Sequence, residues 1–299
     1  MYGASGPDPY IITSDDETKQ IVPGLPGTGN GKASSSLSPL LKWPGGKRAL
    51  LPHLLPLLPP SFGRYYEPFL GGGALFFSAR PYPATLSDTN EELVTCYRMI
   101  RDDPEHVLRL LGRHDNTKTK YLKVRASRPR TDSGRAARLI YLTTLAFNGI
   151  YRVNMQGEFN VPYGWKKHLE VAPRDRIVEV SAALRGRSLQ CLDFEQAVLG
   201  AKAGDLVYLD PPYTVAHGNN GFLKYNAKIF SWEDQTRLAR VASELSARGC
   251  HVILTNACHP SIQELYRGFS HLEVRRQSRI AASASHRGMV SELILTNLR

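Results

Sequence analysis

The sequence predicts an α/β protein built on a mainly parallel β-sheet with helices on both faces. Short apolar runs alternate with helical patterns along the chain, which is typical of this class. A basic and mostly helical segment interrupts the alternation, and the last two strand candidates lie too close together for a helical crossover. We therefore expect a sheet domain at residues 39–97 and 188–299, and an inserted helical domain at residues 98–187.

Composition excludes several classes of protein. The 299 residues can bury a full core, and no apolar run approaches the ~20 residues that a membrane-spanning helix needs. We see no secretory signal, and the four cysteines lack close paired spacing. These features predict a cytoplasmic protein with reduced thiols and no membrane partner. The nine histidines show no metal-ligand spacing, so we predict no metal.

The positive charge is concentrated in one part of the chain. The net charge is +11, and residues 98–187 hold 19 Lys and Arg against 9 Asp and Glu, a balance of +10. A solvated basic surface explains any single Lys or Arg. A segment that carries nearly all the excess favours a polyanionic partner, and nucleic acid is the best candidate.

The first 38 residues are rich in Gly, Pro, Ser and Thr and have no hydrophobic period. We expect residues 1–38 to be disordered. Their GLPGTGNGKAS stretch is not a phosphate-binding loop, because Pro26 stands where the first Gly belongs and Ala33 follows Lys32.

Strand and helix candidates follow in order after this tail. RYYEPFLGGGALFFSAR predicts a strand, a glycine-rich turn and a helix, and ATLSDTNEELVTCYRMI predicts a strand that ends on Asp88 before a helix. The basic segment contains a turn-rich stretch at residues 147–165. Five further strands are predicted in SLQCLDF, GDLVYLD, HVILTN, HLEVRRQ and SELILTN, the last two as an antiparallel hairpin at one edge.

A well-marked helix is predicted in SWEDQTRLARVASELSARG. Ser231 and Asp234 suit a capping box, and Gly249 can end the helix. Its apolar stripe consists of Leu238, Val241, Ala242 and Leu245.

The glycine-rich turn has the character of a ligand-binding loop. Gly71 and Gly73 separate a strand from a helix, and Asp88 follows near the ~20-residue interval at which a carboxylate can bind ribose hydroxyls. Phe76 occupies the third glycine position of the dinucleotide motif, which disfavours a pyrophosphate and suits a nucleoside. A tight turn without a ligand stays an open alternative.

An unusual corner follows the strand GDLVYLD. Pro211 and Pro212 fix the backbone after Asp210, so one carboxylate and the ring of Tyr213 are held rigidly. Asp210 and the carbonyl of Pro211 could each accept one hydrogen of a base amino group, which would direct its lone pair at an incoming methyl group. Tyr213 could stack on an extruded base. The alternative is a stiff turn without chemistry.

Five motifs follow one another along the chain: LKWPGGK, EPFLGGGALF, LSDTNEEL, FNGIYRVNMQGEFNVPYG and VYLDPPY. Together they resemble the Dam-type (D12 class) DNA adenine-N6 methyltransferases from about Leu40 to the C-terminus. The resemblance implies a Rossmann-like S-adenosylmethionine-dependent methyltransferase fold with an inserted DNA-recognition domain. It also implies adenine-N6 methylation of duplex DNA with base flipping, in GATC or a related site.

The resemblance also assigns residues to roles. It implies catalytic roles for Asp210, Pro211, Pro212 and Tyr213, and cofactor contacts for Trp43, Lys47, Glu67, Phe69, Gly71, Gly73, Asp88 and Asp210. It implies DNA contacts for Phe147, Asn148, Ile150, Arg152, Asn154, Pro162 and Arg287. Arg152 would read a guanine, which suits the two bonds that arginine forms with that base. Phe147 stands where the family often has tyrosine, and its ring could fill the space of a flipped base.

Several alternatives stay open. N4-cytosine methylation also acts on an exocyclic amino group and would need the same activation, although Asp rather than Ser at position 210 favours adenine. A catalytically silent DNA-binding protein would keep the fold, and a protein-glutamine methyltransferase is disfavoured because its corner begins with Asn. Trp43 could be a core anchor, and Arg152 could contact only phosphate. We expect a monomer in a prokaryotic cell or a virus-infected host, with a cognate restriction endonuclease as a candidate partner.

Overall fold

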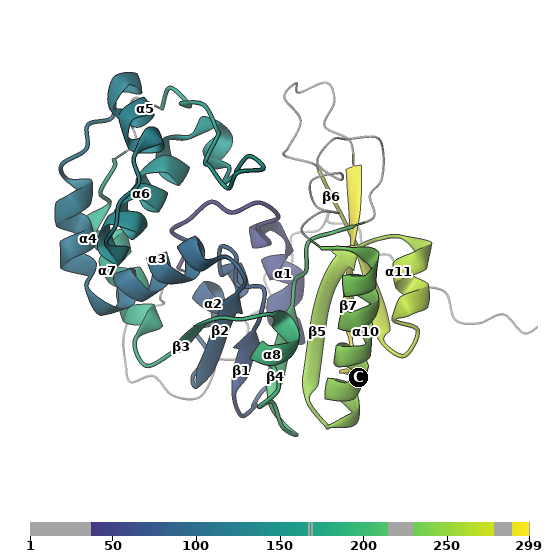
Figure 1. Ribbon diagram of the computed structural model, residues 1–299. Helices are drawn as coiled ribbons and strands as arrows, with labels where there is room; N and C mark the ends of the chain where they lie inside the picture. The colour runs from purple at the N-terminus through teal and green to yellow at the C-terminus, as the bar shows by residue number, and fades with distance from the viewer. Residues whose placement is uncertain (1–36, 167, 169, 215–229, 278–288, 299) are drawn as a thin grey trace, which may run out of the picture. The chain divides into compact units, whose positions relative to one another are not determined.

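The structure is a computed structural model in which two compact units are seen, and Figure 1 shows their elements. The described residues are 37–166, 168, 170–214, 230–277 and 289–298. One unit, Ser35–Leu51 with Arg64–Leu199, is called the glycine-loop unit, and the other, Pro52–Gly63 with Gly200–Arg299, is called the corner unit. The tail that we expect to be disordered lies almost wholly outside the described residues.

The glycine-loop unit contains three parallel strands in the order β3-β2-β1. They are β1 (Tyr65–Glu67), β2 (Ala84–Asp88) and β3 (Ser188–Cys191). Every residue of β1 is buried, and four of the five residues of β2 are buried. Parallel neighbours need a crossover, and the short helix α2 (Ala74–Ala79) supplies the one between β1 and β2.

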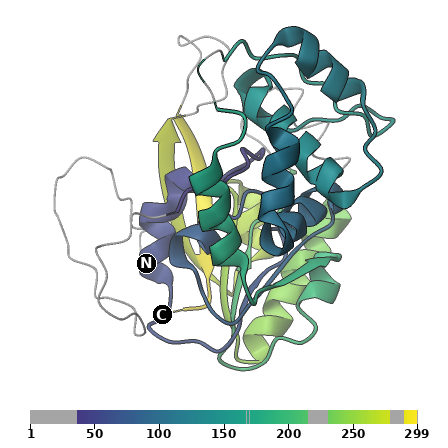
Figure 2. The same ribbon diagram turned by 90° about the vertical axis from the view of Figure 1, so that its left-hand side faces the viewer.

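Helices fill the rest of this unit. They are α3 (Glu91–Asp102), α4 (Pro104–Leu111), α5 (Lys118–Ala126), α6 (Asp132–Leu145), α7 (Arg174–Leu184) and the short α8 (Phe194–Ala197). Helix α6 is buried along most of its length, and α3, α4 and α5 pack against it (Figures 1 and 2). Helix α3 also packs on β2 and β3. The prediction of a mostly helical basic segment is confirmed.

The turn-rich stretch is also confirmed. Between α6 and α7 the chain forms a 3-10 turn, Phe147–Gly149, and two isolated bridges pair Ala146 with Tyr163 and Val153 with Phe159. Residues 147–165 are called the recognition segment below. Earlier in the chain, η1 (Arg48–Leu50), α1 (Leu51–Leu54) and η2 (Leu55–Leu57) form a run of short helices.

The corner unit combines parallel and antiparallel strands in the order β4-β5-β7-β6. Its elements are β4 (Leu206–Leu209), α10 (Trp232–Ala247), β5 (His251–Ala257), α11 (Pro260–Leu265), β6 (Ser270–Gln277) and β7 (Met289–Thr296). Strand β4 is parallel to β5, whereas β7 is antiparallel to both β5 and β6. Helix α10, drawn in green beside β5 in Figure 1, starts with the predicted capping box of Ser231 and Asp234.

All of the predicted strands are present, and the α/β fold class is confirmed. The four cysteines carry free thiols. Within the part of the chain that the structure describes, no helix is long and apolar enough to cross a bilayer. The domain bounds drawn from the charge distribution stay a prediction.

Candidate functional site

The loop after β1, residues 68–73, is called the glycine loop, and it needs glycine at two positions. Gly71 has φ +46° and Gly73 has φ +67°, which is backbone that other residues rarely adopt. A Cβ atom on Gly71 would lie 3.0 Å from Cδ1 of Trp43, and one on Gly73 would lie 2.8 Å from Cε2 of Phe77. The loop therefore packs tightly beside Trp43, and a side chain at either glycine would disturb it.

Asp88, the last residue of β2, is fixed to this loop. Its Oδ2 accepts a hydrogen bond from the N–H of Gly71 at 3.0 Å, and its Oδ1 accepts one from the N–H of Asn90 at 2.9 Å. Although the residue keeps part of its surface exposed, burial of the carboxyl group raises the pKa of Asp88, while the backbone hydrogen bonds oppose that rise. A carboxylate has about four acceptor positions, so ligand hydroxyls can still bind here.

Three other predicted cofactor residues lie in the same unit and are buried or stacked. Glu67 is buried and accepts a hydrogen bond from the hydroxyl of Tyr65 at 2.9 Å, and Lys47 is buried with Nζ donating to the carbonyl of Gly45 at 2.8 Å. Phe69 stacks on Phe194 with ring centroids 5.4 Å apart. Phe194 was missed in the sequence, and its signal is an aromatic residue three positions after the end of β3.

The residues of the glycine-loop unit fit the predicted cofactor. The left-handed Gly71 lets backbone approach a ligand, Asp88 offers acceptors for ribose hydroxyls, and Phe69 offers an aromatic face for a nucleobase. These groups suit the nucleoside part of S-adenosylmethionine. Nothing in the loop requires a phosphate, in agreement with the departure from the dinucleotide motif at Phe76.

Asp210 begins the corner, residues 210–213, directly after the buried strand β4. Thr255 of β5 donates a hydrogen bond from Oγ1 to Oδ1 of Asp210 at 2.6 Å. The hydroxyl of Tyr208 lies 3.4 Å from the same Oγ1. Because Thr255 is fully buried in the sheet, it limits the rotation of the Asp210 carboxylate.

The prolines of the corner are fixed through α10. The side-chain amide of Gln235 donates to the carbonyl of Pro212 at 3.3 Å, and its oxygen accepts from Asn256 at 3.0 Å. Gln235 and Asn256 are fully buried. This relay attaches the corner backbone to α10 and β5 and holds the direction of the Pro212 carbonyl.

Tyr213 closes the corner with a short hydrogen bond. Its hydroxyl donates to Oε2 of Glu292 at 2.7 Å, and Glu292 on β7 is only 3% exposed. Burial, followed by the charge of Glu292, holds the pKa of Tyr213 well above its ordinary range. The phenol therefore stays neutral and donates this bond at any ordinary pH.

The polar partners of the corner were not predicted from the sequence. They are Thr255, Gln235, Asn256 and Glu292. Their signal is a polar residue within an otherwise apolar strand or stripe, as in HVILTN and SELILTN. Burying such a polar side chain costs free energy unless it forms a hydrogen bond inside the protein.

The recognition segment contains six of the seven predicted DNA contacts. Phe147 is 52% exposed, Asn148 adopts φ +54°, and Arg152 is exposed with Nε donating to Oδ1 of Asn160 at 2.8 Å. Asn154 accepts the N–H groups of Gln156 and Glu158 and so shapes the turn.

The remaining predicted DNA contacts are Pro162, Ile150 and Arg287. The carbonyl of Pro162 accepts the N–H of Phe147 at 2.9 Å, and Ile150 is half-buried. Arg287 lies outside the described residues. Among the residues that are described, no group of three His, Cys, Asp or Glu side chains could hold a metal ion.

Comparison with known proteins identifies one family and several relatives. Residues 43–280 match the family described as D12 class N6 adenine-specific DNA methyltransferase. The chain is 40% identical over 276 residues to the Type II methyltransferase M1.LlaDCHI of Lactococcus lactis subsp. cremoris, a match that covers 89% of this chain and 97% of the relative. It is 32% identical over 286 residues to the Type II methyltransferase M.MjaIII of Methanocaldococcus jannaschii, with 87% and 99% covered. It is 32% identical over 266 residues to the Retron Ec67 DNA adenine methylase of Escherichia coli, with 86% and 90% covered.

Proposed function

The chain belongs to the D12 class N6 adenine-specific DNA methyltransferases, and we propose that it transfers a methyl group from S-adenosylmethionine to adenine N6 in duplex DNA. The family predicted from the five motifs and the methyltransferase class of the enzyme are confirmed. One observation carries the chemical proposal: the carboxylate of Asp210 is fixed by Thr255 at the start of a rigid corner that ends on Tyr213.

The corner accounts for activation of a weak nucleophile. The lone pair of the adenine amino group is delocalised into the ring, so the nitrogen attacks poorly. Asp210 accepts one amino hydrogen and the carbonyl of Pro211 accepts the other, which directs the lone pair out of the base plane. Bound S-adenosylmethionine supplies an electrophilic methyl group. The amino nitrogen forms the new N–C bond while the C–S bond breaks, and it then loses one proton to Asp210 or water.

Rigidity is the main contribution of the corner to this reaction. Holding a reacting group in the correct geometry removes part of the entropic barrier before the chemical step. Pro211 and Pro212 restrict the backbone, Gln235 holds the carbonyl of Pro212, and Glu292 holds the ring of Tyr213. Tyr213 then offers its face to the extruded base.

The glycine-loop unit supplies the cofactor contacts in this proposal. Asp88 accepts hydrogen bonds from the ribose hydroxyls, and the glycine loop lets its backbone lie close to the ligand. Phe69 gives an aromatic face to the nucleobase, with Phe194 stacked behind it. Trp43 and Lys47 complete the set of residues that the family resemblance assigns to the cofactor.

The recognition segment supplies the proposed target contacts. Exposed Arg152 reads a guanine, and exposed Phe147 fills the space that the flipped adenine leaves. We propose GATC or a related site as the target. Two of the relatives are named Type II methyltransferases, which supports a cognate restriction endonuclease as a partner. We also propose that the enzyme acts as a cytoplasmic monomer, because one strand is methylated at a time.

The test is transfer of a labelled methyl group from S-adenosylmethionine to unmethylated duplex DNA, followed by digestion to nucleosides. We expect N6-methyladenine from the wild type and none from Asp210→Ala, with no product on a duplex that lacks GATC. N6-methyladenine on GATC-free DNA would keep the chemistry and exclude the target. N4-methylcytosine would favour the rival enzyme, and DNA binding without transfer would favour a silent DNA-binding protein.

A further inference from the structure

Tyr151 links the glycine loop to the recognition segment within a single unit. It directly precedes Arg152, and its ring stacks on the indole of Trp43 with centroids 4.4 Å apart and planes at 18°. The same indole lies against Gly71, where a Cβ atom would come within 3.0 Å of it. The rings of Tyr151 and Trp43 therefore connect the backbone that we assign to the cofactor with the residue that we assign to guanine.

The hydroxyl of Tyr151 makes a second connection. It donates a hydrogen bond to Oε2 of Glu92 at 3.1 Å, and Glu92 lies in the first turn of α3, four residues after Asp88. Asn90, between them, caps α3 and donates its N–H to Asp88. The hydroxyl of Tyr151 is thus attached to the helix that begins at the proposed ribose-binding carboxylate.

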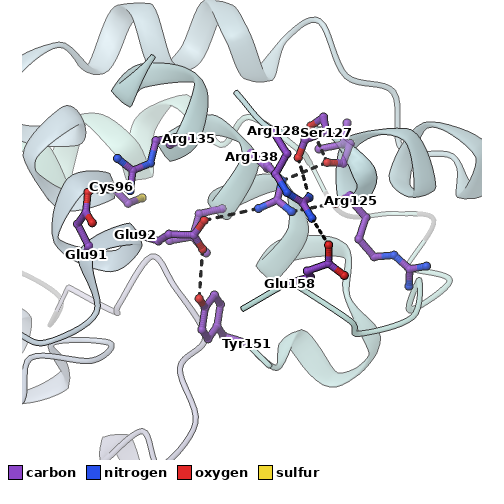
Figure 3. Close-up of polar contacts among 12 residues, drawn as sticks. Glu91, Glu92, Cys96, Arg125, Ser127, Arg128, Arg135, Arg138, Tyr151 and Glu158 are labelled. Atoms are coloured by element: carbon purple, nitrogen blue, oxygen red, sulfur yellow. Dashed lines mark hydrogen bonds and ion pairs between the residues drawn. The ribbon is translucent and has the colours of Figure 1, made fainter. Parts of the chain in front are cut away.

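Glu92 is itself held from the other side. Figure 3 shows its carboxylate between Tyr151 and Arg138, whose Nη1 lies 3.8 Å from Oε1. Arg138 is 7% exposed and donates to the carbonyls of Val124 and Arg125 at the end of α5. A buried guanidinium with these partners has little freedom, so Glu92 presents a fixed acceptor to Tyr151.

The rest of the recognition segment has separate supports. Arg128 pairs with Glu158 (Figure 3). Glu158 also accepts a hydrogen bond from the side chain of Asn154. Tyr163 donates to Oδ1 of Asn116 at 2.8 Å. None of these contacts involves Trp43 or the glycine loop, whereas Tyr151 stacks directly on Trp43, which lies against Gly71.

We propose that Tyr151 is a positioning residue that couples cofactor binding to target reading by Arg152. The inference rests on the proposed function. A ligand in the glycine loop fixes the indole of Trp43. The ring stack and the hydrogen bond to Glu92 then restrict the side chain of Tyr151, and the adjacent Arg152 is aligned with its base. The bound cofactor then strengthens binding to the cognate duplex more than binding to a duplex with a changed base. Coupling between two sites is typically about 5- to 150-fold and is reciprocal.

The experiment measures dissociation constants for a GATC duplex and for the same duplex with its guanine replaced. Each is measured with and without S-adenosylhomocysteine as an unreactive cofactor probe. The coupling factor is the gain in cognate affinity divided by the gain in non-cognate affinity. We expect at least about fivefold for the wild type. Tyr151→Leu, which loses both contacts, is expected to bring the factor close to one.

Two further variants separate positioning from loss of structure. Tyr151→Phe keeps the stack and loses the bond to Glu92, so its coupling factor should fall between the wild-type value and one, without being abolished. Tyr163→Phe is the matched control, because it also removes a tyrosine hydrogen bond from the recognition segment but does not touch Trp43. It should keep the wild-type coupling factor.

The outcomes are distinguishable. A folded Tyr151→Leu or Tyr151→Phe protein with wild-type coupling would overturn the inference, and so would equal losses in Tyr163→Phe. Methyl transfer by a wild type that shows no coupling would also overturn it while leaving the proposed function intact. A wild type that binds neither duplex nor cofactor would overturn the proposed function and this inference with it.

Discussion

Asp88 is the last residue of a buried parallel strand and Asp210 directly follows another, yet the protein holds their carboxylates in different ways. Asp88 accepts hydrogen bonds from two backbone N–H groups, those of Gly71 and Asn90. Asp210 accepts one from a side chain, the hydroxyl of Thr255. The path of the chain therefore supplies donors to the first carboxylate, whereas a side-chain hydroxyl that one substitution can remove supplies a donor to the second.

The difference matches the tasks that we propose for the two residues. A carboxylate that binds ribose hydroxyls must accept hydrogen bonds in a fixed place, and backbone donors provide that place wherever the glycine loop is formed. A carboxylate that activates an amino group must also have the correct rotation, since the lone pair is directed only in one geometry. A buried threonine hydroxyl on the adjacent strand β5 sets that rotation.

The largest expected effect tests the Asp88 half of the comparison. Asp88→Asn replaces a charged acceptor with an amide, and hydrogen bonds to a charged group contribute about 1.5–3 kcal/mol. We expect cofactor affinity to fall by about 10- to 100-fold, with kcat at saturating cofactor within about threefold of the wild type. Titration calorimetry and steady-state kinetics measure the two quantities.

Asp102→Asn is the matched control, because Asp102 lies on the same unit but is exposed and paired with Arg101. It should leave cofactor affinity unchanged. A fall in kcat without a fall in affinity for Asp88→Asn would assign Asp88 to the chemical step and remove the contrast with Asp210.

A smaller effect tests the Asp210 half. Thr255→Val keeps the shape of the side chain and removes the donor to Oδ1 of Asp210. We expect kcat to fall by about tenfold, roughly 1.5 kcal/mol and so at the lower end for one lost hydrogen bond to a charged group, while the KM values for cofactor and DNA change little.

Thr296→Val controls for the loss of a buried hydroxyl in the neighbouring strand β7, since the Thr296 hydroxyl donates to the carbonyl of Val252 and makes no hydrogen bond with the described residues 210–213. It should cost stability without lowering kcat. If both threonine variants reduced kcat equally, the hydroxyl of Thr255 would not be setting the geometry of Asp210.

The two carboxylates also show how far the sequence could be read. Both strand ends, the glycine loop and the capping box of α10 were predicted, because each depends on neighbouring residues and local backbone rules. Thr255, Glu292 and the pair of Tyr151 with Glu92 were not, because each joins residues that are far apart in the chain. The position of β7 between β5 and β6 likewise depends on long-range pairing that no local pattern encodes.

The smallest expected effect is a pH dependence that belongs to Asp88. Burial raises the pKa of this carboxyl group, so its ionised form is lost at a higher pH than for an ordinary aspartate. A protonated carboxyl group has fewer acceptor positions for ribose hydroxyls, and cofactor affinity should therefore decline as the pH falls through the raised pKa. The apo protein should respond in the opposite direction, because protonation relieves the cost of a buried charge and adds to stability as the pH falls through the same range.

Thermal unfolding with and without S-adenosylhomocysteine, measured from pH 8 downward, separates the two trends. The shift in Tm produced by the ligand should shrink by a few degrees before ordinary carboxyl groups titrate, about pH 3.9 for aspartate. A ligand-induced shift in Tm that stays constant down to that pH would mean that the hydrogen bonds from the N–H groups of Gly71 and Asn90 outweigh burial, so that the Asp88 carboxylate stays ionised.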